Sequence, residues 1–290
     1  AEHSALARPL VDRFVAGTDL DRALAVARQL TADRFVSLDH LGENTESLAQ
    51  AEDATSAYLA LLDRVGAEGM ADRAEVSIKL AALGQALPSG GAELATDNAA
   101  TICARAAAVG TTVTVDMEDH TTTDATLETV RALRRDFPDT GAVLQAYLHR
   151  TEADCHDLAY EGSRVRLCKG AYKEPESVAF QGRREVDKAY VRAMKALMAG
   201  AGYPMLATHD PRLIAIGAEL ARRNDRAKDS YEFQMLYGIR PHEQERLAAA
   251  GQRMRVYVPY GDEWYGYLVR RMAEKPANLA LFLRSMISKR

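Results

Sequence analysis

The sequence predicts a closed (β/α)8 barrel, with an extra helix before it and, after it, a helix that contains an arginine pair. Three observations lead to this prediction. Short runs of alternating apolar and polar residues recur along the chain, helical patterns separate these runs, and each strand-plus-helix unit takes roughly 20–35 residues. Eight such units in 290 residues fit the ~250 residues that this barrel typically needs.

The alternating runs predict strands near residues 34–39, 74–79, 111–116, 141–146, 164–169, 204–208, 230–236 and 253–258. Helices are predicted at Leu20–Leu30, before the barrel, and then at Glu46–Arg64, Leu94–Ala108, Thr123–Arg135, Arg183–Met198, Arg212–Arg223 and Glu243–Ala250. The segment Asp262–Lys289 predicts one or two more helices, with Pro276 at a break or in a first turn.

A doubly wound open sheet is the alternative to a barrel. Such a sheet usually has a G-x-G-x-x-G turn after its first strand, and this sequence contains none. No linker rich in Pro, Gly or Ser divides the chain. We therefore expect one domain over residues 1–290, in which residues 1–32 form a helical extension and residues 33–290 form the barrel.

The composition excludes several classes of protein. The net charge of −4 gives no support for nucleic-acid binding. Cys103, Cys155 and Cys168 are odd in number and lack the spacing of a metal pair, which favours a reducing compartment over a disulfide framework. No apolar run reaches the ~18 residues that a transmembrane helix needs. We expect a cytoplasmic protein without a bound metal.

Polar residues gather near the carboxyl ends of the predicted strands. Lys79 ends the run Val76-Ser77-Ile78-Lys79, and Asp116 ends Thr112-Val113-Thr114-Val115-Asp116. Active groups of a (β/α)8 barrel lie at this end of the strands, so the pattern predicts an enzyme. A buried ion costs several kcal/mol unless it is paired, so these charges need a ligand or each other. The other candidates at this rim are Gln145, Arg166–Lys169, Thr208–His209, Gln234–Leu236 and Tyr257.

Lys79 has three alternative roles: a Schiff-base lysine, a group that binds carboxylates, or a surface residue. Its alternation with Val76 and Ile78 favours the lumen of the barrel. Asp116 on the neighbouring strand is its expected charge partner. A structural ion pair is as good an explanation of these two residues as a catalytic role.

Two loops after predicted strands suggest contacts with an anionic or flat ligand. In Arg166-Leu-Cys-Lys169-Gly170-Ala171-Tyr172, two cations precede a Gly-Ala pair that lets backbone N–H groups approach a ligand. In Ala207-Thr208-His209-Asp210-Pro211, a strand meets the start of a helix, where phosphate binds readily. The alternatives are a plain tight turn for the first loop and helix capping by Thr208 or Asp210 for the second.

Arg270 and Arg271 form an adjacent pair that Glu274 can reach from one turn further along a helix. Two guanidinium groups held by a carboxylate can bind an anion through planar, bidentate hydrogen bonds. The alternative is a solvated basic step on a surface helix. The histidines lack metal spacing, so a zinc site is rejected.

Four motifs, in order along the chain, resemble proline dehydrogenase. They are Arg166-Leu-Cys-Lys-Gly-Ala-Tyr172, Ala207-Thr-His-Asp210, Tyr231-Glu-Phe-Gln-Met-Leu236, and Tyr267-Leu-Val-Arg-Arg271 followed by Glu274. Lys79, Asp116 and Gln145 match the family in the same order. The length is similar to that of the monofunctional bacterial enzymes, without room for an aldehyde dehydrogenase module.

The resemblance implies a flavoprotein that oxidises L-proline to Δ1-pyrroline-5-carboxylate, the first step of proline catabolism to glutamate. It implies non-covalent FAD at the carboxyl end of the barrel and hydride transfer from proline C5 to FAD N5. It also implies a quinone as the electron acceptor, with peripheral contact to the inner face of a membrane. The stretch Leu279–Ile287 is an amphipathic candidate for this contact, although such helices more often pack on protein.

The resemblance also implies the roles of individual residues. Arg270 and Arg271 are expected to bind the proline carboxylate, with Lys79 as a third cation, and Glu274 is expected to hold the arginines. Asp116 and Arg166 are the implied catalytic residues. The implied walls of the substrate pocket are Tyr257 and Leu236, and the implied FAD contacts are Met117, Gln145, Arg166, Lys169, Gly170, Ala171, Thr208 and His209.

Two other functions remain open at this point. A barrel aldolase or lyase with Lys79 as its Schiff base would be colourless and trapped by borohydride with its carbonyl substrate. A non-enzymatic barrel would bind a partner through its arginine-rich C-terminal helix and hold no flavin. Neither function requires the four motifs. The sequence leaves open the acceptor, the oligomeric state (a homo-oligomer is one alternative) and the range of cyclic amino acids accepted.

Overall fold

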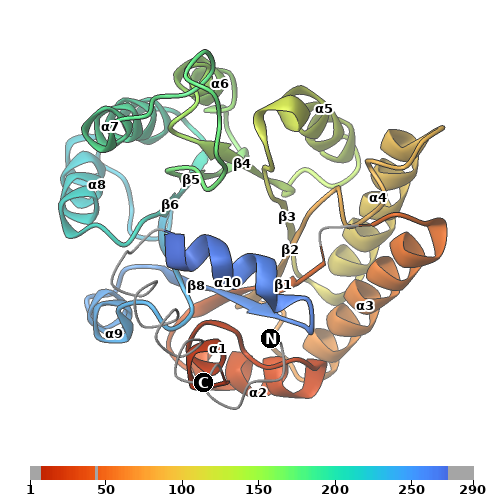
Figure 1. Ribbon diagram of the computed structural model, residues 1–290. Coiled ribbons are helices and arrows are strands. Elements are labelled where there is room, and N and C mark those ends of the chain that lie inside the picture. Colours follow the sequence, from red (N-terminus) through yellow and green to blue (C-terminus); the bar gives the residue numbers. More distant parts are fainter. Residues whose placement is uncertain (1–7, 43–44, 274–290) are drawn as a thin grey trace, which may run out of the picture.

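Eight parallel strands close into a barrel in which neighbours follow the order of the sequence, as the computed structural model shows (Figure 1). The structure describes residues 8–42 and 45–273. Parallel pairing of β1 with β8, from Phe35↔Arg255 to His40↔Tyr260, closes the sheet. The predicted (β/α)8 barrel is thus confirmed. The strands are β1 Phe35–His40, β2 Ala74–Ile78, β3 Val113–Val115, β4 Gly141–Gln145, β5 Arg164–Cys168, β6 Tyr203–Ala207, β7 Glu232–Leu236 and β8 Met254–Tyr260.

Helices surround the barrel and alternate with its strands (Figure 1). Before β1 lie α1 Arg8–Phe14 and α2 Leu20–Leu30, and α2 buries Ala23, Leu24 and Ala27. The other helices are α3 Leu48–Ala67, α4 Gly91–Val109, the 3-10 turn η1 His120–Thr122, α5 Thr123–Leu133, α6 Thr151–Asp157, α7 Arg183–Ala199, α8 Pro211–Arg223, α9 Pro241–Ala249 and α10 Trp264–Ala273.

The helices predicted between residues 20 and 250 agree with the structure, and Leu20–Leu30 agrees to the residue. Of the segment Asp262–Lys289, the structure describes one helix, Trp264–Ala273. No bounds were predicted for two short helices, α6 and α1, the latter within the predicted helical extension 1–32. Each has 7 residues, about two turns, which is too short for apolar residues to repeat with helical spacing. The helix α1 forms because Val11 and Phe14 pack on residues far along the chain.

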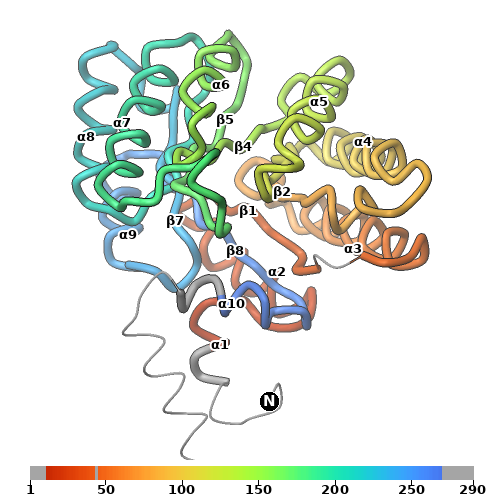
Figure 2. The backbone as a smooth tube through the Cα atoms, turned by 45° about the horizontal axis from the view of Figure 1, so that its top comes forward, coloured from red at the N-terminus to blue at the C-terminus, as the bar shows by residue number. Residues whose placement is uncertain are grey.

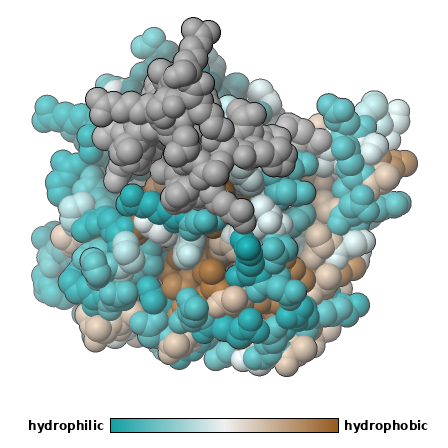
Figure 3. All heavy atoms as spheres, turned by 60° about the horizontal axis from the view of Figure 1, so that its bottom comes forward, coloured by the Kyte–Doolittle hydropathy of each residue, from teal (hydrophilic) through white to brown (hydrophobic). Residues whose placement is uncertain are grey.

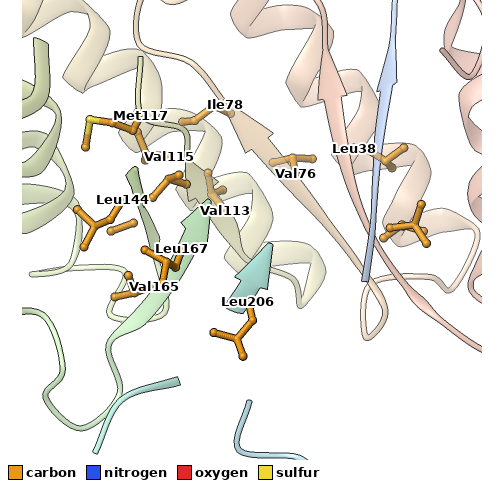
Figure 4. Close-up of a cluster of buried hydrophobic side chains, with 14 of the residues drawn as sticks. Leu38, Val76, Ile78, Val113, Val115, Met117, Leu144, Val165, Leu167 and Leu206 are labelled. Carbon is orange, nitrogen blue, oxygen red and sulfur yellow. The ribbon is translucent and has the colours of Figure 1, made fainter. Parts of the chain in front are cut away.

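The two faces of each strand differ as the alternation predicted. The labelled side chains in Figure 4 come from the outward-facing positions, and all of them are buried between barrel and helices. They include Leu38 of β1, Val76 of β2 and Leu167 of β5. The inward-facing positions hold polar and charged residues that are equally buried, among them Ser37, Glu75, Ser77, Thr114, Arg166, Gln234 and Arg255.

The helix α10 lies across the carboxyl end of the barrel, beside α1 (Figures 1 and 2). Tyr267 and Leu268 of α10 pack with Phe14 of α1 and with Leu41, which directly follows β1. The backbone of Arg270 and Arg271 belongs to this helix. Glu274, Pro276 and the stretch Leu279–Ile287 lie outside the described residues.

Hydrophilic residues dominate the face shown in Figure 3, around a smaller hydrophobic area. The large hydrophobic residues that are exposed are few among the described residues: Leu48, Tyr160, Tyr265 and Val269. Within residues 8–42 and 45–273, no helix has the length and apolar character that crossing a membrane requires.

Candidate active site

Lys79 directly follows β2 and its side chain is buried at the carboxyl end of the lumen. Its Nζ lies 2.8 Å from both carboxylate oxygens of Asp39, the inward-facing residue near the end of β1. The expected partner, Asp116, is further away, with Oδ2 at 3.6 Å. A carboxylate in contact stabilises the ammonium cation, whereas a Schiff-base lysine needs a neutral amine. The geometry therefore favours a cationic role for Lys79.

Asp116 joins the groups at the centre of the mouth. Its Oδ1 accepts hydrogen bonds from Arg166 Nη1 at 2.7 Å and from Ser77 Oγ at 2.9 Å. Its Oδ2 accepts a hydrogen bond of 2.6 Å from the hydroxyl of Tyr257. One carboxylate thus connects β2, β5 and β8, and it fixes two of the side chains that the sequence singled out.

The surroundings of Arg166 and Tyr257 shift the pKa of each group in a direction that keeps its proton in place. Burial opposes the charge of Arg166, but the carboxylates of Asp116 and Glu75 hold the pKa of its guanidinium above the ordinary value. Burial, together with the charges of Asp116 and Asp39, raises the pKa of Tyr257 well above 10. Tyr257 therefore remains a hydrogen-bond donor at neutral and moderately alkaline pH. Its ring also lies against Arg166, with Cζ 5.2 Å from the ring centroid.

A second group of charges fills the lumen below the mouth, towards the amino ends of the strands. Glu75 Oε2 accepts from Arg164 Nη2 at 2.6 Å, and Glu232 Oε1 accepts from Arg255 Nε at 2.6 Å. Arg255 also lies 3.8 Å from Glu75. Together with the mouth groups, the ion pairs of the described residues join four acidic side chains to four basic ones: Asp39, Glu75, Asp116 and Glu232 against Lys79, Arg164, Arg166 and Arg255.

Sequence reasoning missed Asp39 and Glu75 as members of this network. The signal was present, because each alternates with apolar neighbours on its own strand, as Asp39 does with Leu38. The expectation that lumen charges need partners is confirmed, since they partner one another.

Gln145, the last residue of β4, joins the loops that follow β3 and β5. Its Nε2 donates to the carbonyl oxygen of Glu118 at 2.6 Å, and its Oε1 accepts from the backbone N–H of Ala171 at 3.3 Å. Gly170 precedes this contact with φ +124°, and a Cβ at that position would lie 2.3 Å from Cδ1 of Tyr147. Only glycine fits here, so the loop lies closely against the Tyr147 ring.

Lys169 directly follows β5, and its side chain contacts the surrounding helices instead of the lumen groups around Arg166. Its Nζ lies 2.5 Å from Asp187 Oδ1 on α7 and 3.8 Å from Asp210 Oδ2 at the start of α8. A cavity of about 510 Å³ opens beside it. The residues that line this cavity include three cations and three aromatic rings: Lys169, Lys173, Arg183, Tyr147, Tyr172 and Phe180.

In the loop before α8, Thr208 and Asp210 accept backbone hydrogen bonds at the start of the helix, which is the capping role that the sequence left open beside phosphate binding. The side chain of Asp210 accepts from the backbone N–H of Arg212, and Thr208 Oγ1 accepts from the N–H of Asp210. The hydrogen bonds to Arg212 lower the pKa of Asp210 to about 2, so a carboxylate caps this helix. His209 Nε2 accepts from the N–H of Leu236, which joins the β6 loop to the end of β7.

The structure brings the predicted residues together in three groups: Lys79, Asp116, Arg166 and Tyr257 in the lumen, Gln145, Lys169, Gly170 and Ala171 at the ends of β4 and β5, and Thr208, His209 and Leu236 at the ends of β6 and β7. Met117 is separate, because its side chain lies on the outward face in the hydrophobic cluster (Figure 4). For Arg270 and Arg271, the structure describes only the backbone, which belongs to α10. Glu274 lies outside the described residues.

A matching family model and two relatives of this chain are described as proline dehydrogenases. A family model described as proline dehydrogenase matches residues 23–283. A proline dehydrogenase of Deinococcus radiodurans is 39% identical over 281 residues, which are 96% of this chain and 90% of the relative. Proline dehydrogenase 2 of Bacillus subtilis strain 168 is 36% identical over 283 residues, which are 97% of this chain and 92% of the relative.

Solved structures have the same fold. Proline utilization A from Bdellovibrio bacteriovorus, inactivated by N-propargylglycine, aligns with a TM-score of 0.84 and 26% identity over 92% of this chain. A variant of proline utilization A from Bradyrhizobium japonicum aligns with a TM-score of 0.78 and 25% identity, again over 92% of this chain. The chain covers 32% and 31% of those two proteins, about a third of their length.

Proposed function

Since the chain belongs to the proline dehydrogenase family, it is an oxidoreductase that oxidises proline, and we propose that it is an FAD-dependent enzyme that converts L-proline to Δ1-pyrroline-5-carboxylate. The electrons then pass to a quinone. The observation that carries this proposal is the convergence of Lys79, Asp116, Arg166 and Tyr257 in one lumen, at the barrel end where active groups lie.

The residues beside β5 fit a flavin dinucleotide. The cavity of about 510 Å³ offers cations for a diphosphate and aromatic rings for flat groups. Gly170, which has no room for a Cβ, supports close approach of the backbone to a ligand. We propose that Gln145, Lys169, Gly170, Ala171, Thr208 and His209 hold FAD, with Arg166 at its reactive edge and Met117 in contact through its backbone. When bound, FAD accepts a hydride from proline C5 at its N5.

The substrate carboxylate needs cations at the mouth. Lys79 supplies one, and its ion pair with Asp39 holds it at the end of β2. The motif positions assign Arg270 and Arg271 to the same carboxylate and Glu274 to the arginines. A carboxylate held by three cations has a fixed orientation, which sets the position of the C5–H bond. Tyr257 and Leu236, whose Cα atoms are partners on adjacent strands, wall the ring pocket.

The chain contributes orientation and electrostatics and needs no nucleophile. The proline ammonium group loses a proton to solvent, and the C5–H bond breaks with its electron pair leaving with the hydrogen. The nitrogen lone pair forms the C5=N bond of an iminium ion, which releases its remaining N–H proton to solvent. Because the ammonium form cannot release the hydride, we expect activity to rise on the alkaline side. The positive charge of Arg166 would stabilise the negative charge that the flavin gains when it is reduced.

The direct experiment is an assay of the purified protein with L-proline and a soluble quinone, in which Δ1-pyrroline-5-carboxylate is detected with o-aminobenzaldehyde. We expect product to form with L-proline and activity to be lost after treatment with N-propargylglycine, which inactivated the Bdellovibrio protein. A colourless protein that borohydride inactivates with a carbonyl substrate, and that leaves proline unchanged, would support an aldolase instead.

The finer assignments follow from the same proposal. A quinone acceptor implies peripheral contact with a membrane on its cytoplasmic side, and sedimentation with quinone-containing vesicles tests this. Self-association to a homo-oligomer is tested by light scattering in the same samples.

A further inference from the structure

Arg166 uses every N–H of its guanidinium inside the barrel. An arginine side chain has five N–H groups. Two of its acceptors are charged: Asp116 Oδ1 lies 2.7 Å from Nη1, and Glu75 Oε1 lies 3.2 Å from Nη2. The other three acceptors are Ser77 Oγ at 2.8 Å from Nη1, Ser37 Oγ at 3.2 Å from Nη2 and Gln234 Oε1 at 2.6 Å from Nε.

The two charged acceptors bond different nitrogens of the guanidinium and come from different depths of the lumen. Asp116 follows β3 at the mouth, where it also meets Tyr257 and Lys79. Glu75 belongs to β2, two residues before Ser77 and four before Lys79, and therefore faces the lumen one step deeper. The guanidinium is thus bonded to two carboxylates. Asp116 also contacts other groups at the mouth, whereas Glu75 lies deeper in the lumen.

Glu75 is itself fixed on all sides. Its Oε1 accepts from Ser37 Oγ at 2.5 Å and from Thr114 Oγ1 at 3.2 Å. Its Oε2 accepts from Arg164 Nη2 at 2.6 Å. Burial favours the neutral acid, but the guanidinium groups of Arg255, Arg164 and Arg166 hold the pKa of Glu75 well below its usual range. Glu75 is an anion with a rigid position at physiological pH.

Without this anion, Asp116 would be the one charged acceptor of Arg166 among the described residues. The guanidinium would then move towards Asp116 and the mouth, and the Asp116 oxygens would share their bonds differently between Arg166 and Tyr257. A displacement of about 1 Å at a reacting centre can cost a hundredfold in rate.

We propose that Glu75 is a positioning residue that holds Arg166 at the depth the reaction requires, although Glu75 itself lies below the mouth. This inference rests on the proposed function, in which Arg166 lies at the reactive edge of the flavin. It assigns a role to a carboxylate that no motif of the sequence singled out.

The test compares two variants that remove one negative charge from the same buried layer. Glu75→Gln removes the anion that contacts Arg166. Glu232→Gln removes an anion that contacts Arg255 at 2.6 Å and meets Arg166 only through Gln234, and the new amide oxygen can still accept from Gln234 Nε2. Both purified holoproteins are measured for kcat, for KM with proline, for the flavin absorption spectrum and for thermal unfolding.

We expect Glu75→Gln to lower kcat by roughly 10- to 100-fold, with KM for proline within about two-fold of the original, because Arg166 is not a carboxylate ligand. The flavin spectrum is expected to shift in this variant, since the guanidinium moves relative to the ring. Glu232→Gln is expected to keep the original kcat and spectrum. Both variants are expected to unfold at lower temperatures.

Equal loss of kcat in both variants, or a Glu75→Gln protein with unchanged kcat and spectrum, would overturn the positioning role while leaving the proposed function intact. An original protein that binds no flavin and leaves proline unoxidised would overturn the function and this inference with it. If Glu75→Gln does not fold, Ser37→Ala gives the answer, because Ser37 contacts both Glu75 and Arg166. A smaller loss of kcat with the same spectral shift is then expected, and unchanged values would contradict the inference.

Discussion

Both carboxylate oxygens of Asp39 lie 2.8 Å from the ammonium group of Lys79, and this ion pair joins β1 to β2 at the carboxyl end of the barrel. Asp39 is 1% exposed and Lys79 8% exposed, so neither charge is well hydrated. The pair keeps a cation available in the mouth in the absence of substrate. In the role that we propose for Lys79, a substrate carboxylate would share the ammonium group with Asp39, and this would limit the affinity that Lys79 alone provides.

Lys79→Met separates binding from stability. A charge-assisted hydrogen bond contributes about 1.5–3 kcal/mol, so loss of the cation is expected to raise KM for proline by roughly 10-fold or more. The unpaired Asp39 should also destabilise the protein by about 3–5 kcal/mol. The double variant Asp39→Asn with Lys79→Met should recover much of the unfolding temperature while KM stays high. Steady-state kinetics and thermal denaturation measure both effects, and full recovery of KM in the double variant would exclude a substrate role.

Tyr257→Phe removes the 2.6 Å hydrogen bond to Asp116 and keeps the ring that lies against Arg166. We expect kcat/KM to fall about 10-fold, in line with one lost hydrogen bond to a charged group. Since burial raises the pKa of Tyr257 well above 10, its hydroxyl does not titrate in the assay range. The rise of activity between pH 6 and pH 9 should therefore keep its midpoint.

The control is Tyr231→Phe, which removes a 2.7 Å hydrogen bond to Gln252. It should leave kcat/KM unchanged. A shift of the alkaline midpoint in Tyr257→Phe would mean that this hydroxyl titrates, contrary to the geometry.

Gly170→Ala tests the loop that we assign to FAD. The new Cβ would lie 2.3 Å from Cδ1 of Tyr147, and the backbone has φ +124°. The loop must move, so we expect the flavin content of the purified protein to fall by half or more. Gly162→Ala is the matched control, because its φ of +80° imposes similar strain while no atom lies within 4 Å of the new Cβ. Equal flavin content in the two variants would show that the Gly170 loop does not contact the cofactor.

Acid unfolding should report on Glu75. The pKa of Glu75 is lower in the folded protein than its ordinary value of 4.5, so the ionised group stabilises the fold above that pH. This contribution is lost progressively as the pH falls below it. The unfolding temperature of the original protein should therefore drop more steeply between pH 5 and pH 3 than that of Glu75→Gln, which is less stable at neutral pH. Parallel curves would mean that Glu75 is not an ion in the folded barrel.

Alternation along the strands predicted which side chains enter the lumen. Asp116 and Arg166 lie there because strand residues two apart share a face, and Met117 lies outside because it has the opposite parity. Alternation could not predict that Lys79 meets Asp39 more closely than Asp116, since both flanking strands are candidates. The stagger between strands decides that choice, and stagger is a property of the closed barrel.

The short helix α6 and the contacts of Glu75 also depend on the assembled barrel and not on a local sequence pattern. The helix α6 has 7 residues, and its stability comes from burial of Thr151 and Cys155 in the assembled fold. The role of Glu75 requires that β1, β2 and β5 meet across the lumen, which no local pattern records. Contacts across a closed barrel depend on all of its strands at once.

The most direct test of the central claim is the visible spectrum of the purified protein before and after anaerobic addition of L-proline. We predict a flavin absorption band that bleaches on addition of proline and returns when a quinone is added. A protein that shows no flavin band even after incubation with FAD, or a band that proline leaves unchanged, would contradict the account.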